Sequence, residues 1–436
     1  MKIAPSLSTR PDEVGGGGGG DGGRSARGPG GYDPALADSS RVLENFLQTL
    51  LNGLAVGSLY ALIALGYTMV YGILKFINFA HSDVFVLGAW ISYACALLSG
   101  FLDVDTATVG LQTTHVPRWL LFTLVGGTSA SLVVAGISYI RSRSLSEGVR
   151  ALLLGTTWAW ACLGLALTAR ALKLSGWSLT AGGVILLVAM LTCGLVGFTL
   201  ERVAYKPLRR APRLNVLITA IGISLLLQNL GQLNWMFGDR PQGMPELLKD
   251  RMLLELGGTL AANAPDGSRV WAVQPVRIGS LDCIVVGTAV MLMLLLDWLV
   301  FHTKIGRAMR AVSFSERNAA LMGIPVDRII SFTFVLGSML AAAAGFLYAQ
   351  KYSKLGQTAD TLWVLLGLKA FVAAVIGGIG NIRGAMLGGV LIGLLEFFGV
   401  AYFVPQLRDV YVFGILIIVL IVRPGGILGS TAIEKV

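Results

Sequence analysis

The sequence predicts an all-α polytopic membrane protein, a bundle of about 10–11 transmembrane helices. Three observations predict this class. Hydrophobic residues make up 55% of the 436 residues, and charged residues make up only 13%. Soluble domains carry about 25% charged residues, so this chain lacks the composition of an ordinary water-exposed surface. Uncharged runs of about 20 residues, long enough to cross about 30 Å of hydrocarbon, also recur along the chain.

The apolar runs define the predicted elements in order. They cover residues 45–74, 84–102, 119–140, 151–169, 174–200, 214–238, 281–301, 329–350, 361–380, 384–403 and 410–422. Residues 1–44, which include the glycine tract Gly15–Gly20, have too few large apolar side chains to offset the entropy cost of ordering. We therefore expect a disordered tail over 1–44, a transmembrane domain over 45–429 and a short C-terminal tail over 430–436.

Strongly basic loops recur at alternate connections between the runs, and the long 237–279 connection has mixed charges without a basic excess. If each run crosses the membrane once, the basic loops 141–150, 201–213 and 303–328 share one side, and the 237–279 segment lies on the other. Lys and Arg collect on the cytoplasmic side of membrane spans. This predicts a cytoplasmic 303–328 loop, an external 237–279 loop and a cytoplasmic C-terminus. The net charge of +10 is then explained by topology, and no nucleic acid partner is expected.

The 303–328 loop contains the signals of a short helix. Ser315 can cap the first free N–H groups of a helix, and Glu316 adds negative charge at its positive end. Gly323 stands where the helix would end, and Pro325 follows two residues later. These residues predict a short cytoplasmic helix between two spans.

Two polar positions within the spans are candidates for a transport path. Lys369 lies within one apolar run, and insertion of a cation at mid-membrane costs about 2.5–3.5 kcal/mol of free energy. We therefore expect Lys369 to contact a cavity or an acid. Glu396 in the next run is its candidate partner. The pair could equally be a structural tie between two helices. Gln228 and Asn229 could line a polar path, or could form hydrogen bonds between helices.

Glycine at four-residue spacing predicts close helix packing. Gly380, Gly384 and Gly388 follow this spacing, and so do Gly389 and Gly393. Helices with side-chain-free ridges can cross closely. The same segment lacks the Lys and Ser/Thr of a phosphate loop, so packing is the favoured interpretation.

Motifs of catalysis are absent from the sequence. It contains no Walker A pattern, no HExxH and no GxSxG, and its three histidines lie far apart. We therefore expect no catalytic residue, no metal site and no cofactor bound by this chain.

Five phrases together carry a family resemblance. They are NGLAVGSLYALIALGYTMVYGILKFINFAHSD (52–83), ERVAYKPLRRAPRLNVLITAIGISLLLQN (201–229), TKIGRAMRAVSFSERNAALMGI (303–324), GLKAFVAAVIGGIGNIRGAMLGG (367–389) and RPGGILG (423–429). With these phrases the chain resembles the LivH-type permeases, the membrane subunits of ATP-binding-cassette (ABC) importers for branched-chain amino acids. The resemblance covers most of residues 46–429. It departs from the family pattern in the glycine-rich tail, in the longer 141–181 region and at Ser82, where the family has glycine.

The resemblance implies a bacterial-type plasma-membrane permease of the ABC importer type, and it implies partner chains. These are a second, LivM-like permease, two cytoplasmic ATPases that use ATP and Mg²⁺, and an extracytoplasmic solute-binding protein, all assembled in membrane lipid. The segment Ser315–Met322 would be the helix that couples to the ATPase. Within and beside it, residues Glu316, Ala319, Ala320 and Gly323 match the family's pattern, and Arg307 and Arg310 could pair with acidic groups of the ATPase.

The resemblance leaves alternatives open for the substrate. Permeases of urea or amide importers share the same phrases, because specificity largely resides in the binding protein. A stand-alone secondary transporter is a third possibility, and Glu396 is its one well-placed intramembrane acid. The leading hypothesis is a non-enzymatic permease for branched-chain or other small neutral amino acids.

Overall fold

The computed structural model describes residues 34–98, 168, 178–209, 211–233, 236–248, 250–257, 259–263, 269–273 and 275–429. Its helices are α1 (Pro34–Leu74), α2 (His81–Leu98), α5 (Ser178–Leu200), the π-helix η3 (Glu201–Tyr205), α6 (Lys206–Leu208), α7 (Arg213–Gly231), α8 (Ser280–His302), α9 (Lys304–Phe314), α10 (Glu316–Leu321), α11 (Val326–Tyr352), α12 (Thr361–Gly377), α13 (Ile382–Tyr402), the 3₁₀ helix η4 (Pro405–Leu407) and α14 (Arg408–Val422).

The structure confirms the predicted helical-bundle class. Within the described ranges, seven helices are long and apolar enough to cross a membrane, namely Val42–Leu74, Leu179–Leu208, Leu214–Gly231, Ser280–His302, Val326–Tyr352, Ile382–Tyr402 and Pro405–Val422. Helices α2 and α12 match two further predicted runs. The runs expected at 119–140 and 151–169 lie outside the described residues, as do most of the 141–181 region and the 430–436 tail.

Two element boundaries differ most from the sequence prediction. Helix α1 begins at Pro34, so the last part of the expected 1–44 tail is helical. Proline suits a helix start because its fixed φ is helical and its missing N–H has no partner to lose there. Helix α7 ends at Gly231 instead of Gly238, and Gly238 itself turns the chain with a φ of +83°.

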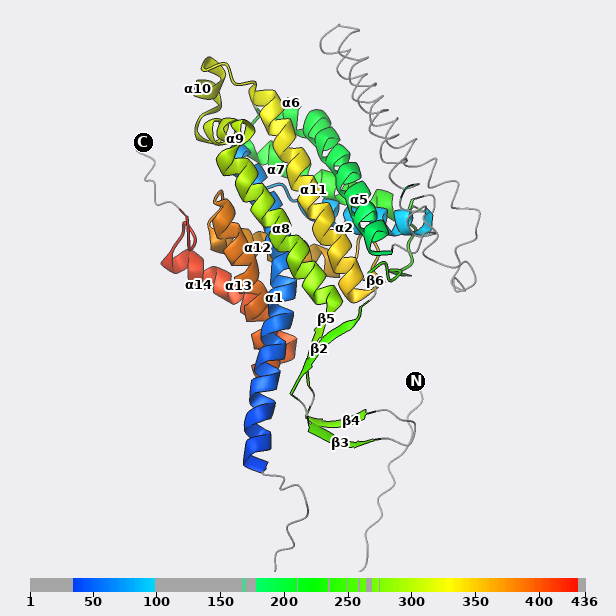
Figure 1. Cartoon of the computed structure of the whole chain (residues 1–436). Helices are drawn as coiled ribbons and strands as arrows, with labels where there is room; N and C mark the ends of the chain where they lie inside the picture. Colours follow the sequence, from blue (N-terminus) through cyan, green and yellow to red (C-terminus); the bar gives the residue numbers. More distant parts are fainter. Residues whose placement is uncertain are drawn as a thin grey trace, which may run out of the picture.

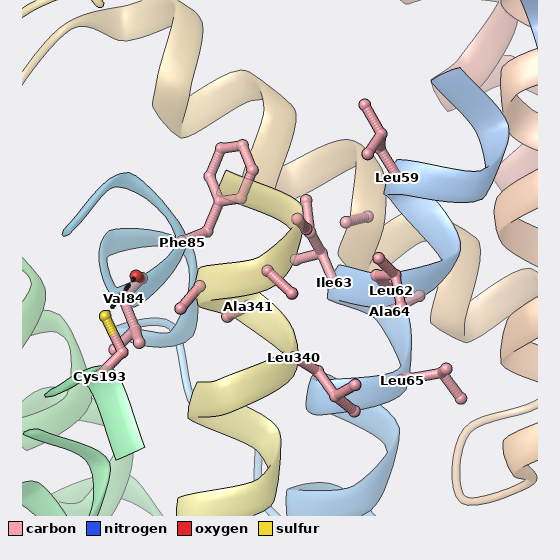
Figure 2. Packing of buried hydrophobic residues seen from close by; sticks show 14 of the residues in the cluster. Leu59, Leu62, Ile63, Ala64, Leu65, Val84, Phe85, Cys193, Leu340 and Ala341 are labelled. Atoms are coloured by element: carbon pink, nitrogen blue, oxygen red, sulfur yellow. Dashed lines mark hydrogen bonds between the residues drawn. The ribbon is translucent and has the colours of Figure 1, made fainter. Parts of the chain in front are cut away.

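Helices α1 and α11 form the centre of the bundle. The α1 span is 94% buried, whereas the α14 span is only 6% buried. Helix α1 packs against α13 and α11, and α11 also packs against α2 and α5. Figure 2 shows the junction, where Leu62 and Ile63 of α1, Phe85 of α2 and Ala341 of α11 point into one apolar cluster. Figure 1 shows α11 running between α8 and α5.

Glycines bring α1 and α13 into close contact. A Cβ atom built on Gly393 would lie 2.3 Å from the Cα of Gly57, and one on Gly57 would lie 2.9 Å from the Cα of Val390. A Cβ on Gly389 would similarly lie 2.3 Å from the Cα of Ala61. The crossing therefore uses backbone-to-backbone contact that only glycine permits.

Of Gly380, Gly384 and Gly388, which the sequence predicts to allow close helix packing, only the last two lie in a helix–helix contact. Gly384 and Gly388 lie against α12, where an added Cβ would meet the carbonyl oxygens of Gly377 and Ala373 at 2.2 and 2.1 Å. Gly380 lies between α12 and α13, with a φ of +93°, and turns the chain instead. The expected ridge is interrupted because α12 ends at Gly377.

We predict that Gly393→Ala destabilises the folded permease by roughly 1–3 kcal/mol, because the added methyl group must push apart two backbones. Gly287→Ala in α8 is the matched control, since nothing lies within 4 Å of its Cβ position. That control should be neutral or stabilising by up to ~1 kcal/mol. Thermal unfolding of the purified protein in detergent measures both, and equal melting temperatures for the two variants would contradict the tight crossing.

The 237–279 segment contains short strands at one end of the bundle. They are β1 (Gln242–Gly243), β2 (Met252–Leu256), β3 (Thr259–Asn263), β4 (Arg269–Val273) and β5 (Val276–Gly279). Antiparallel pairs form between β2 and β5 and between β3 and β4, and β1 pairs with β6 (Lys354–Leu355) after α11. Figure 1 shows β2 to β5 at the opposite end of the bundle from α6, α9 and α10, so these strands lie opposite the basic loops 201–213 and 303–328.

Candidate coupling and transport sites

The 303–328 loop folds as two helices, α9 and α10. Thr303 caps α9 by accepting a hydrogen bond from the Gly306 N–H at 3.0 Å. Helix α9 buries Gly306, Met309 and Val312 on one side, at three-residue spacing. The sequence prediction missed α9, although this apolar spacing between basic residues is typical of an amphipathic helix.

Helix α10 has the caps that the sequence predicts. The Ser315 hydroxyl accepts a hydrogen bond from the Asn318 N–H at 3.3 Å. At the other end the Gly323 N–H donates to the Ala320 carbonyl (3.0 Å), and the Ile324 N–H donates to the Ala319 carbonyl (3.1 Å). Gly323 has a φ of +78°, as this type of helix end requires. The helix spans Glu316–Leu321, with Ser315 as its cap, and so lies within the expected Ser315–Met322.

The candidate coupling residues divide into exposed and packed groups. Glu316, Ala320 and Gly323 are exposed, whereas Ala319 is buried against the bundle. Arg307 is exposed, but the Arg310 guanidinium lies over the Phe301 ring, 5.2 Å from its centroid. Arg310 therefore already has a partner within the chain.

Large apolar side chains are exposed around α10. Phe314 is 91% exposed, Met322 84% and Leu321 80%. These residues flank α10 at the end of the bundle that also carries α6 and α9 (Figure 1). Exposed apolar side chains beside basic residues are typical of a protein-binding surface.

An ion-pair network joins the two basic loops. Asp327, at the start of α11, pairs with Lys206 and Arg209, each at 2.7 Å. Arg209 also pairs with the fully buried Glu201 of η3, whose other oxygen accepts a hydrogen bond from Ser331 at 2.5 Å. The chain just after α10 is thus tied to the end of α5. A π-helix at this junction fits the tendency of such segments to occur at functional sites.

Lys369 and Glu396 are brought together at the interface of α12 and α13. Lys369 Nζ lies 2.8 Å from Glu396 Oε1 and 2.7 Å from Asp409 Oδ1. Both members of the Lys369–Glu396 pair are buried, at 2% and 4% exposure. The Tyr60 hydroxyl of α1 donates to Glu396 Oε2 at 2.8 Å, and Arg408 Nε lies 3.2 Å from Glu396 Oε1.

The pair is therefore part of a network of two cations and two acids. We name the residues Tyr60, Lys369, Glu396, Arg408 and Asp409 the charge cluster. Sequence reasoning missed Tyr60, Arg408 and Asp409. The sequence did contain a signal for two of them, because the adjacent charged residues Arg408 and Asp409 lie between the last two apolar runs. Since the charges balance, the cluster ties α1, α12, α13 and α14 together without net charge inside the bundle.

The two adjacent amides Gln228 and Asn229 have different environments. Gln228 Nε2 donates to Asp83 Oδ1 at 2.8 Å, which joins α7 to α2. Asn229 is exposed, and its Nδ2 donates to the Leu225 carbonyl of its own helix at 2.7 Å. Only Gln228 therefore faces the bundle. The partner of Asp83 lies 145 residues away, so local sequence pattern could not identify it.

Two comparisons place the chain among known proteins. The family model for branched-chain amino acid transport system permease components matches residues 49–181 and 159–420. The permease LivH of Salmonella typhimurium is 32% identical over 391 residues, which are 90% of this chain and 98% of that protein. LivH of Escherichia coli K12 is 33% identical over the same shares of the two chains. The Pseudomonas aeruginosa permease BraD is 34% identical over 392 residues, also 90% and 98% of the two chains.

No solved structure matches the chain. The family model and the curated relatives nevertheless agree over nearly the whole length, and the described helices are those of a multi-pass membrane protein. By these findings the chain belongs to the family of branched-chain amino acid transport permease components.

Proposed function

We propose that this chain is the permease subunit of an ABC importer that carries branched-chain or other small neutral amino acids. The single observation that carries the proposal is 32–34% identity to high-affinity branched-chain amino acid permeases across 98% of their length. An importer of this kind is completed by a second permease, two cytoplasmic ATPases that bind ATP and Mg²⁺, and an extracytoplasmic solute-binding protein.

The surface around α10 supports docking of an ATPase. Phe314, Leu321 and Met322 are exposed at the basic end of the bundle, so a partner that covers them gains apolar contact area. Arg307 and Arg317 beside them are also exposed and favour an acidic rim on that partner. A displacement of α10 would be transmitted to the end of α5 through the ion pairs that Arg209 forms with Asp327 and with Glu201.

The arrangement of the ends supports a cytoplasmic C-terminus. The Ile427 and Leu428 N–H groups donate to the Ile376 and Gly377 carbonyls at the end of α12. A Cβ atom built on the neighbouring Gly380 would lie 3.9 Å from the Cα of Gly72, close to the end of α1 and thus at the end of the bundle with the 201–213 and 303–328 loops. Since basic loops are cytoplasmic, the chain after α14 would leave the bundle on the cytoplasmic side.

The test is purification of the tagged chain from native membranes in mild detergent, followed by mass spectrometry of the proteins that accompany it. The proposal expects a second permease and two ATPase subunits in fixed ratio, and a binding protein whose extracted solute is a small neutral amino acid. Recovery of urea or an amide in that binding protein would instead favour the related importer class. Recovery of the chain alone, with no ATPase under conditions that keep the lipid annulus, would contradict the proposal.

A further inference from the structure

A small pocket lies between α2, α7 and the segment before α12. Its lining has a polar and an apolar part, made of Asp83, Gln228 and Thr358 and of Val86, Leu87 and Leu227. The space inside suits a group of about the size of one water molecule. The pocket is separate from the charge cluster, and no role in coupling accounts for it.

Asp83 is a buried acid that lacks a cation. Its side chain is only 5% exposed, and Oδ1 accepts the hydrogen bond from Gln228 Nε2. Oδ2 is buried without a hydrogen-bond partner, and among the described residues no ion pair includes Asp83. A carboxylate inside a membrane bundle is costly without a positive partner. The pocket therefore offers one carboxylate oxygen to a cation from outside the chain.

The pocket lies beside chain segments that lead into the 237–279 segment, which the sequence predicts to be external. The Thr358 hydroxyl donates to the Gln228 carbonyl at 2.7 Å. Thr358 belongs to the connection between α11 and α12, at the same end as β6, and Gln228 lies three residues before the end of α7. Strand β6, just before Thr358, pairs with β1 of the 237–279 segment, and the chain after α7 leads directly into that segment.

We propose that Asp83, Gln228 and Thr358 form a subsite for the primary ammonium group of an aliphatic amino acid in transit. An ammonium group is about the size of a water molecule and supplies the positive charge that would balance the Asp83 carboxylate. It also donates hydrogen bonds, which Asp83 Oδ2 and the Thr358 hydroxyl oxygen can accept. Because the space takes only one water-sized group, the aliphatic side chain of the same ligand lies outside the pocket. Asp83 repels a carboxylate, so the acid end of the ligand points out of the pocket.

The subsite rests on the proposed function, and its first test needs no variant. Tritiated leucine is bound to the purified importer without its binding protein, and two competitors are compared. Isoamylamine keeps the ammonium and the branched chain, and 4-methylpentanoate keeps the acid and the branched chain. The subsite predicts that the amine displaces leucine at least tenfold more effectively than the acid. Absent leucine binding, or equal competition by the two compounds, would overturn the subsite.

The second test uses Asp83→Asn, which preserves size and the oxygen that accepts from Gln228. A structural role survives this change, whereas an ammonium site does not. We expect ATP-driven leucine uptake to fall at least tenfold and amine competition to disappear, while Asp83→Glu retains part of both. Gly222→Ala, in the same helix α7 and with nothing within 4 Å of its Cβ position, is the control and should leave uptake unchanged.

Four outcomes separate the claims. Wild-type uptake of leucine together with equal uptake by Asp83→Asn overturns the subsite and leaves the proposed function intact. Failure of the wild-type importer to carry any small neutral amino acid overturns both. Loss of wild-type uptake when choline replaces sodium would assign the pocket to an inorganic cation and overturn the ammonium subsite. Unchanged uptake in choline supports the ammonium.

Discussion

Simultaneous replacement of Glu316 and Gly323, as in E316A/G323V, should abolish ATP-driven uptake while the permease still reaches the membrane in normal amounts. Gly323 has a φ of +78°, and a residue with a side chain pays about 1–2 kcal/mol for that conformation. The end of α10 then loses the hydrogen bonds that its Gly323 and Ile324 N–H groups make. Removal of Glu316 weakens the other end of the same six-residue helix.

The damage should remain local to α10. Nothing lies within 4 Å of the Cβ position of Gly323, and Glu316 is exposed, so the bundle itself loses no contact. Uptake into proteoliposomes is compared with the amount of permease in the membrane, and with the ATPase activity that co-purifies. Gly222→Ala is the matched control, because its Cβ position is equally open but its backbone is helical. Normal uptake in the double variant would remove α10 from the coupling path.

Lys369→Met should cost the folded permease about 3–5 kcal/mol, because it leaves Glu396 and Asp409 close together in the bundle with one cation fewer. The double variant K369M/E396Q should recover much of this loss. It removes one charge of each sign and leaves Arg408 and Asp409, which lie 3.8 Å apart, to balance each other. Thermal unfolding of each variant in detergent gives the double-mutant cycle.

The control is Asp297→Asn, which breaks an ion pair with Arg383 whose guanidinium side chain is 62% exposed. It should lower stability little, since exposed pairs contribute little. If Lys369→Met proved as mild as this control, the charge cluster would not hold the four helices together. A charge swap of Lys369 and Glu396 is a poor test, because it would place the new lysine beside Arg408 and the new acid beside Asp409.

Features with a local cause were predictable from the sequence. The caps of α10 follow from Ser315 and Gly323, because a cap depends on residues three to five positions away. The placement of the 201–213 and 303–328 loops at one end of the bundle follows from the tendency of Lys and Arg to collect in loops on the cytoplasmic side. Four-residue glycine spacing likewise indicated close packing, although it could not say that Gly57 meets Gly393.

Features that depend on long-range contacts were not predictable. The Asp83–Gln228 hydrogen bond and the Tyr60–Glu396 hydrogen bond join residues 145 and 336 positions apart. Single-sequence pattern carries no information on which distant helices meet, so the partners of Lys369 beyond Glu396 were missed. Gly380 was misplaced because the predicted run continued to residue 380, whereas α12 ends at Gly377 and Gly380 lies in the turn before α13.

The most direct test of the central claim, that this chain is an ATPase-driven permease, is uptake into proteoliposomes. Vesicles contain the importer that co-purifies with this chain, ATP and Mg²⁺ inside, and the solute-loaded binding protein outside. We predict accumulation of leucine, isoleucine or valine above the external concentration, dependent on ATP hydrolysis and lost in E316A/G323V. Accumulation driven by an ion gradient in vesicles that hold this chain alone, without ATPases, would contradict the account.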